Sequence, residues 1–155
     1  MICFSRIDDR LIHGQVVTTW VNMHNIEQIV VLNDKIGNDE TQKNILTMAA
    51  PSGIKVRAFP VKKFAEIIKK QKITRRTMLL FTTSEDVLEA VENGVPIDAL
   101  NIGGMRYREG REKVSKALSV TPEERDAFKK LLEKDLDITI QMVPHDEKVD
   151  LREVI

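Results

Sequence analysis

Residues 77–102, TMLLFTTSEDVLEAVENGVPIDALNI, predict one complete strand–helix–strand unit. The apolar run Thr77–Phe81 is typical of a buried strand, and Ala99–Ile102 is expected to form the next one. Between them, Glu85–Glu92 is expected to form a helix, with Ser84 in front of it as the N-cap. A strand, a helix and a second strand in this order predict two parallel strands joined by a crossover helix.

The same alternation runs through the whole chain, so the predicted fold class is α/β with a largely parallel sheet. Further strands are expected at Ile2–Ile7, Gln28–Leu32, Lys55–Phe59 and Ile138–Val143, with weaker strand character at Val114–Leu118. Further helices are expected at Gly14–Met23, Asp39–Ala49, Val61–Lys70 and Pro122–Lys134.

Helix boundaries and apolar stripes support this assignment. Gly94 is expected to end its helix in a left-handed conformation, and Thr121–Glu124 has the pattern of a capping box with proline in the first turn. Trp20 and Met23 are expected to face the core, because residues three apart share one side of a helix. The last helix should bury an apolar stripe formed by Phe128, Leu131, Leu132 and Leu136.

Length and composition predict one folded domain over residues 1–155. A hydrophobic content of 42% excludes intrinsic disorder, and 24 basic against 24 acidic residues provide no general basic field for nucleic-acid binding. Cys3 is the single cysteine, so no internal disulfide can form. The start of the chain lacks the apolar run of a signal peptide, and no run approaches the ~20 residues of a membrane span. We therefore expect a cytoplasmic protein without direct membrane insertion.

The densest group of reactive side chains follows the first predicted strand, in Arg6–Gln15, RIDDRLIHGQ. Ligands of parallel sheets collect outside the carboxyl ends of the strands, so this segment is the first candidate site. His13 lies at the start of a predicted helix, beside Gly14, where backbone N–H groups and the helix dipole favour an anion. Arg10 can add a bidentate contact to phosphate oxygens.

The field of the helix also favours a neutral His13, the form that can attack phosphorus. Asp8 or Asp9 is expected to accept a hydrogen bond from the other ring nitrogen and fix the tautomer. The remaining aspartate is expected to cap the loop or pair with Arg6. The alternative is a surface turn of ion pairs followed by an ordinary histidine at a helix start.

Other segments point to chemistry less clearly. Gly103–Arg111 contains paired glycines and three arginines, so it either forms a wall of the same crevice or docks an acidic partner, or it is a hairpin with a solvated basic rim. His24 and His145 lack metal-site spacing, and nucleotide-binding fingerprints are absent, so neither metal nor cofactor is expected. Thr83 and Ser84 lack the surroundings of a hydrolase nucleophile.

The segment Arg6–Val16 resembles the signature of the IIB component of the mannose/fructose/sorbose class of the bacterial phosphoenolpyruvate-dependent sugar phosphotransferase system. The similarity extends over essentially the whole chain. It departs from the family at Asp135, where members often have a helix-ending glycine. Further family-like positions are Asn33-Asp34, Ala50-Pro51, Asn101–Met105, Gly110-Arg111 and Lys113–Val120.

The resemblance implies an open, mostly parallel sheet with helices on both faces. It also implies that His13 is the phosphorylated histidine, modified on Nδ1, and that Arg10 and Arg6 hold the phosphoryl group. Backbone groups of Gly14 and Gln15 are expected to complete that site. Asp8 and Asp9 are expected to support it.

The implied protein is a cytoplasmic phosphocarrier, a phosphotransferase in sugar uptake, held at the membrane through its partners. It would accept phosphoryl from the IIA component and pass it to a sugar presented by the IIC/IID membrane pair. The sugar and the oligomeric state are not predicted. The alternative function is a noncatalytic anion- or nucleotide-binding module that uses the His13 loop.

Overall fold

In a computed structural model, which describes residues 1–155, the chain forms a seven-stranded sheet and a separate two-stranded hairpin. The sheet contains β1 (Ile2–Asp8), β2 (Gln28–Leu32), β3 (Lys55–Phe59), β4 (Thr77–Phe81), β5 (Ala99–Gly104), β8 (Asp137–Ile140) and β9 (Val149–Asp150). The hairpin contains β6 (Glu112–Ser115) and β7 (Leu118–Val120). The helices are α1 (Gly14–His24), α2 (Asp34–Gly37), α3 (Glu40–Met48), α4 (Val61–Lys70), α5 (Ser84–Glu92), α6 (Pro122–Glu133) and the 3-10 turn η1 (Leu151–Glu153).

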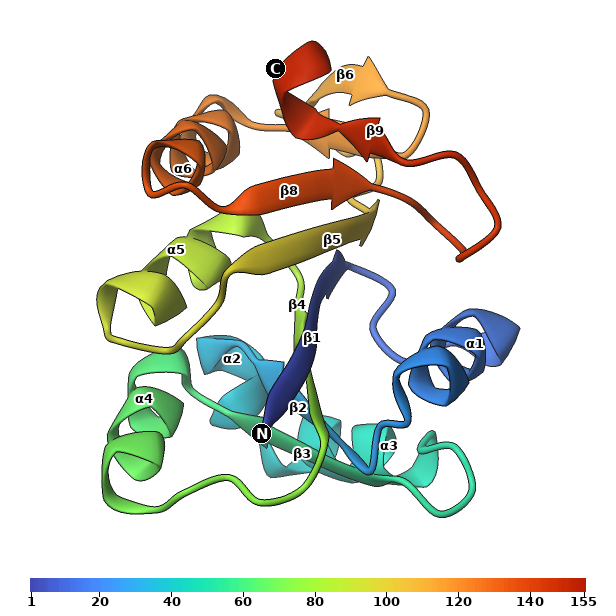
Figure 1. The fold of residues 1–155 in the computed structure, drawn as a ribbon, viewed down its shortest axis with the longest axis vertical. Coiled ribbons are helices and arrows are strands. Elements are labelled where there is room, and N and C mark those ends of the chain that lie inside the picture. The colour runs from blue at the N-terminus through green and yellow to red at the C-terminus, as the bar shows by residue number, and fades with distance from the viewer.

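The strand order is β3-β2-β4-β1-β5-β8-β9, and every pair is parallel except β8 with β9. Helices α4, α5 and α6 lie on one side of the sheet and α1 and α3 on the other (Figure 1). The predicted α/β class is therefore confirmed. Because β1 lies between β4 and β5, its carboxyl end opens at the middle of the sheet, where chain connections leave toward opposite faces.

The two faces of the sheet bury cores of unequal size. The side covered by α4, α5 and α6 contains a cluster of 23 buried apolar residues, and the α1 side contains one of 11. Trp20 belongs to the smaller core, as predicted, but Met23 is 59% exposed. The prediction for Met23 was wrong because the apolar stripe of α1 narrows to Val17, Trp20 and Val21.

Several local predictions differ from the structure. The N-cap of α5 is Thr83, whose hydroxyl accepts from the Asp86 amide, and Ser84 is the first residue of the helix. The predicted strand Val114–Leu118 spans the turn between β6 and β7. The capping box of α6 is confirmed, and Gly94 has a positive φ of 92°. No helix combines the length and the apolar composition that a membrane crossing requires.

Candidate functional site

The loop after β1 turns sharply and brings His13 back toward the end of the strand. Leu11 has a left-handed φ of 60°, and its amide donates to the Asp8 carbonyl at 2.9 Å. His13 is the N-cap residue of α1 in an extended conformation, and Gly14 follows with a φ of 46°. A left-handed conformation favours glycine, so Gly14 lets the helix begin directly after the histidine.

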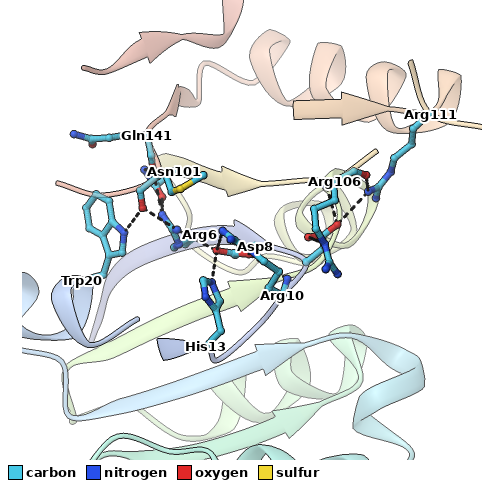
Figure 2. Close-up of polar contacts among 11 residues, drawn as sticks. Arg6, Asp8, Arg10, His13, Trp20, Asn101, Arg106, Arg111 and Gln141 are labelled. Carbon is cyan, nitrogen blue, oxygen red and sulfur yellow. Dashed lines mark hydrogen bonds and ion pairs between the residues drawn. The ribbon is translucent and has the colours of Figure 1, made fainter. Parts of the chain in front are cut away.

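The carboxylate of Asp8 is the centre of the site (Figure 2). Its side chain is 1% exposed, and Oδ2 lies 3.1 Å from both Arg6 Nη2 and His13 Nε2. Oδ1 accepts from the backbone amide and the Nε of Arg10, each at 3.1 Å. Three cationic or potentially cationic side chains therefore share one buried carboxylate.

These contacts decide the charge of Asp8. Burial acts to raise the pKa of this carboxyl, but hydrogen bonds from Arg10 and His13 and the charge of Arg6 outweigh burial, so the pKa is lowered. Asp8 is therefore ionised near neutral pH and can only accept hydrogen bonds. A neutral His13 must then carry its proton on Nε2, which leaves the lone pair on Nδ1.

His13 is accessible from solvent. Its side chain is 26% exposed, and its only hydrogen bond is the one between Nε2 and Asp8. Nδ1 is therefore free of intramolecular partners. It lies at the amino-terminal end of α1, whose first turn contains no acidic residue. The positive end of the helix dipole and the exposed ring edge thus coincide.

Arg6 lies on the buried side of Asp8. The residue is 2% exposed, and its guanidinium donates to the Asn101 side chain and to the carbonyls of Gln141, at 3.2 Å, and Met142, at 3.0 Å. The indole of Trp20 stacks on it with 5.2 Å between the guanidinium carbon and the ring centroid. This burial does not fit the expectation that Arg6 contacts phosphate. Arg6 instead forms an ion pair with Asp8 on the buried side of the carboxylate and holds it in place.

Gly103 explains why an arginine can occupy this position. A Cβ at residue 103 would overlap the guanidinium of Arg6, so only glycine leaves room for it. Burial lowers the pKa of Arg6 but is opposed by Asp8, and the ion pair keeps the buried charge neutralised. The paired glycines of the sequence thus signal close packing against an arginine.

Asp9 contacts a different part of the chain. Its carboxylate accepts from the backbone amide and Nε of Arg106 at 2.9 and 3.2 Å, and from Arg111 Nη1 at 3.2 Å. Asp9 does not pair with Arg6, contrary to one sequence-based expectation. The loop Gly103–Arg111 therefore packs against the residue next to Asp8, while its Arg106 side chain stays 67% exposed to solvent, so the structure contains features of both interpretations of this loop.

Arg111 connects this loop to α6. Its side chain is fully buried and forms a two-point contact with the Glu124 carboxylate at 2.9 and 2.8 Å. Burial alone would lower the pKa of Arg111, but Glu124 and Asp9 raise it. The same Glu124 completes the capping box of α6. A single buried arginine therefore links the loop after β1 to the start of the last helix.

The remaining candidates lie outside this arrangement. Ser84 is fully buried and donates to the Glu124 carbonyl at 2.8 Å, so it cannot act as a nucleophile. His24 stacks on Phe4 with 4.2 Å between ring centroids, and no group of three or more histidine, cysteine or acidic residues is arranged to hold a metal ion. Gln15 is exposed beside His13.

Comparison with known proteins assigns the family. Residues 2–155 match the family model described as PTS system sorbose subfamily IIB component. The chain belongs to this family of sorbose-subfamily IIB components. The fructose-specific EIIB component of Bacillus subtilis (strain 168) is 36% identical over 155 residues, which cover 99% of this chain and 95% of that protein.

Solved IIB structures have the same fold. The IIBSor domain of the sorbose permease from Klebsiella pneumoniae superposes with a TM-score of 0.92 at 38% identity, covering 98% of this chain and 94% of that one. The mannose-specific EIIAB component of Escherichia coli (strain K12) is 38% identical over 156 residues. The IIB chain described here covers 48% of that protein, about half its length.

Proposed function

We propose that this IIB chain is a phosphocarrier in which His13 Nδ1 accepts a phosphoryl group from a phosphorylated IIA component. The observation that carries the proposal is the 3.1 Å contact between His13 Nε2 and the buried, ionised Asp8. It holds one ring nitrogen as the hydrogen-bond donor and leaves the other, with its lone pair, at the exposed edge of the loop.

The transfer needs in-line geometry and charge neutralisation. The Nδ1 lone pair attacks phosphorus while the bond between phosphorus and the donor's histidine nitrogen breaks, and the electron pair returns to the donor ring. The phosphoryl oxygens carry negative charge throughout. Arg10, whose side chain is 30% exposed, lies next to Asp8 on the same loop and can turn its free guanidinium nitrogen toward them.

Backbone groups supply a second source of positive potential. The amides of Gly14 and Gln15 begin α1 and have no partner within the helix, since the first turn of any helix leaves its N–H groups free. Together with the dipole of α1, they favour a phosphoryl group on the neighbouring His13. The site therefore neutralises the phosphoryl group with residues of this loop.

Asp8 gains importance once the phosphoryl group is attached. Phosphorylation of Nδ1 leaves the proton on Nε2 and places positive charge on the ring. The ionised Asp8 lies 3.1 Å from that nitrogen and stabilises this charge. Arg6 contributes by keeping Asp8 ionised and fixed, so it is a positioning residue in this mechanism and makes no contact with the phosphoryl group.

The second transfer reverses the chemistry. A sugar hydroxyl attacks phosphorus and gives up its proton to a base on the sugar side of the site or to water, while the bond to His13 Nδ1 breaks and the electron pair returns to the imidazole. We assign the sugar to the IIC/IID membrane components, so the chain is expected to be a cytoplasmic protein that associates with the membrane through these partners. A partly exposed histidine suits this role, because two different proteins must reach it in turn.

The second candidate function is a binding module that holds an anion at the same loop without a covalent intermediate. The free amides of α1 and Arg10 favour it. A labelling experiment separates the two. The purified protein is incubated with phosphoenolpyruvate and the upstream phosphodonor proteins, including the IIA component, and the phosphate bound to the protein is measured. The carrier gains acid-labile, base-stable phosphate, and His13→Ala abolishes it. Full labelling of His13→Ala rejects the carrier.

A further inference from the structure

A cavity of about 260 Å³ lies beside the proposed phosphoryl site, between the end of β5 and the β6–β7 hairpin. It is lined by four cationic side chains and by no acidic residue. The cationic residues are Arg10, Arg106, Lys113 and Lys116. Such a lining produces a positive potential inside a concave surface, where it is screened less than on an open one.

The charges of the cavity are only partly neutralised by the chain. Arg10 pairs with Asp8, and Arg106 pairs with Asp9. Lys113 and Lys116 are both exposed and take part in none of the ion pairs of the structure. The two lysines therefore leave the cavity with an excess of positive charge that an anion can balance.

The cavity and the proposed phosphoryl site share Arg10. Gly104 lines the cavity, and a Cβ at that position would lie 3.6 Å from Arg10 Nη2. The guanidinium of Arg10 therefore lies beside Gly104 in the lining of the cavity, while its Nε donates a hydrogen bond to Asp8 at 3.1 Å. An anion in the cavity and a phosphoryl group on His13 would compete for the same arginine.

We propose that this cavity is a second anion site that binds a small phosphate ester. Pockets for drug-sized ligands have volumes of roughly 300–1,000 Å³, so this one suits a smaller molecule such as a monosaccharide phosphate. Lys113 and Lys116 bind the phosphate. Tyr107, which is 70% exposed, and Ser119 also line the cavity and offer an aromatic face and a hydroxyl to the sugar.

The assignment of the ester as a sugar phosphate rests on the proposed function, whose product has this chemistry. The accumulated product would then occupy the cavity, draw Arg10 from the His13 side and slow phosphorylation of the carrier. The anion site itself depends only on the geometry and charge of the cavity.

Binding is measured by NMR titration of the full chain with glucose 6-phosphate, inorganic phosphate and uncharged glucose. We expect the two phosphates, and not glucose, to shift amide signals of the β6–β7 hairpin. The double variant K113Q/K116Q should weaken glucose 6-phosphate binding at least about tenfold, because two charged contacts are lost. The variant K69Q/K70Q removes the same charge from exposed positions of α4 and should bind normally.

A second measurement tests regulation and separates the two proposals. Glucose 6-phosphate should slow His13 labelling in the wild-type protein and in K69Q/K70Q but not in K113Q/K116Q. Absence of hairpin shifts, or equal affinity in all three proteins, overturns the anion site even where His13 is labelled normally. If K113Q/K116Q instead slows labelling without any ester present, the cavity contacts the donor protein and the proposal is wrong. If the carrier proposal is wrong but the anion site exists, His13 will stay unlabelled while glucose 6-phosphate still shifts the amide signals of the hairpin.

Discussion

Asp8 and Asp9 are neighbours in one loop, yet the structure uses them in different ways. Asp8 is 1% exposed and binds Arg6, Arg10 and His13, all within its own loop and strand. Asp9 is 14% exposed and binds Arg106 and Arg111, which lie about a hundred residues further along the chain. Because successive residues at a strand end point in opposite directions, one carboxylate faces the histidine and the other faces the opposite wall.

The different contacts give the two aspartates different roles: Asp8 takes part in the proposed chemistry, and Asp9 supports the loop. Asp8 contacts the imidazole ring directly, so it determines which nitrogen of the neutral histidine carries the proton. The Asp9 carboxylate forms no hydrogen bond or ion pair with His13 or Arg10, so its effect on transfer passes only through the position of the loop. Substitution of each aspartate by asparagine keeps the side-chain size and removes the charge, and therefore tests this distinction.

Apart from the loss of His13 itself, the largest expected effect comes from Asp8→Asn. The amide can present N–H to His13 and no longer stabilises the charged ring, so the rate of phosphoryl transfer should fall by about 100-fold. Arg6 would be left buried without its counter-charge, which should lower the free energy of unfolding by about 3 kcal/mol. Rapid-quench labelling and urea unfolding measure the two quantities.

Asp9→Asn is the matched control for that variant. Arg111 keeps its two contacts with Glu124, so the free energy of unfolding should fall by only about 1 kcal/mol, and transfer should slow less than about threefold. A decrease in transfer rate as large as that of Asp8→Asn would show that the two aspartates do not have separate roles.

Arg10→Ala should have the next largest effect on transfer. Loss of the guanidinium removes a contact to the phosphoryl oxygens and should slow transfer by about 10- to 100-fold. Stability should change by less than about 1 kcal/mol, because the side chain is part-exposed. Arg125→Ala is the control, since its side chain is 29% exposed and pairs with Glu112 on the surface. Equal transfer rates in Arg10→Ala and Arg125→Ala would remove Arg10 from the mechanism.

The smallest effect is expected at Asp86, a third aspartate that lacks a cationic partner. Burial, together with the charges of Asp34, Glu89 and Glu85, raises its pKa to about 6, although a hydrogen bond from Asn33 at 3.0 Å opposes the shift. A raised pKa means that the folded protein disfavours the charged form. The charge therefore costs stability above about pH 6, and the cost fades as the pH falls toward the unfolded value near 4.

Asp86→Asn should consequently stabilise the protein by about 1 kcal/mol at about pH 8 and have almost no effect at about pH 4. Asp98→Asn, at an exposed position, should change little at either pH. Thermal unfolding of both variants across this range measures the difference. A constant stability gain at all pH values would show that ionisation of Asp86 is not its source.

Most of the fold could be predicted from the sequence, because strand patterns, helix patterns and helix caps depend on residues that are close together in the chain. The bounds of β2, β3, β4 and α4 agree with the prediction, and the capping box of Thr121 and Glu124 needs only residues three apart. The short helix α2 and strand β9 were missed. β9 has two residues and is defined by its antiparallel pairing with β8, which no local pattern reveals.

The sequence predicted which segment forms the candidate site, but not the contacts that connect this segment to distant parts of the chain. The group Arg6–Gln15 is dense enough in charge to be recognised, and the geometry places Asp8, Arg10 and His13 together. The burial of Arg6 could not be predicted, because it depends on Gly103 and Trp20 from distant parts of the chain. The pairing of Asp9 with Arg111 spans 102 residues and depends on tertiary structure in the same way.

The most direct test of the mechanism is the identity of the ring nitrogen that carries phosphate. The protein is labelled with ¹⁵N-histidine, phosphorylated with its donors, and examined by NMR for coupling between phosphorus and each nitrogen of His13. Because Asp8 holds Nε2 as a hydrogen-bond donor, coupling is expected to Nδ1. Coupling to Nε2 would mean that the contact with Asp8 breaks before transfer, and would contradict the role assigned to that carboxylate.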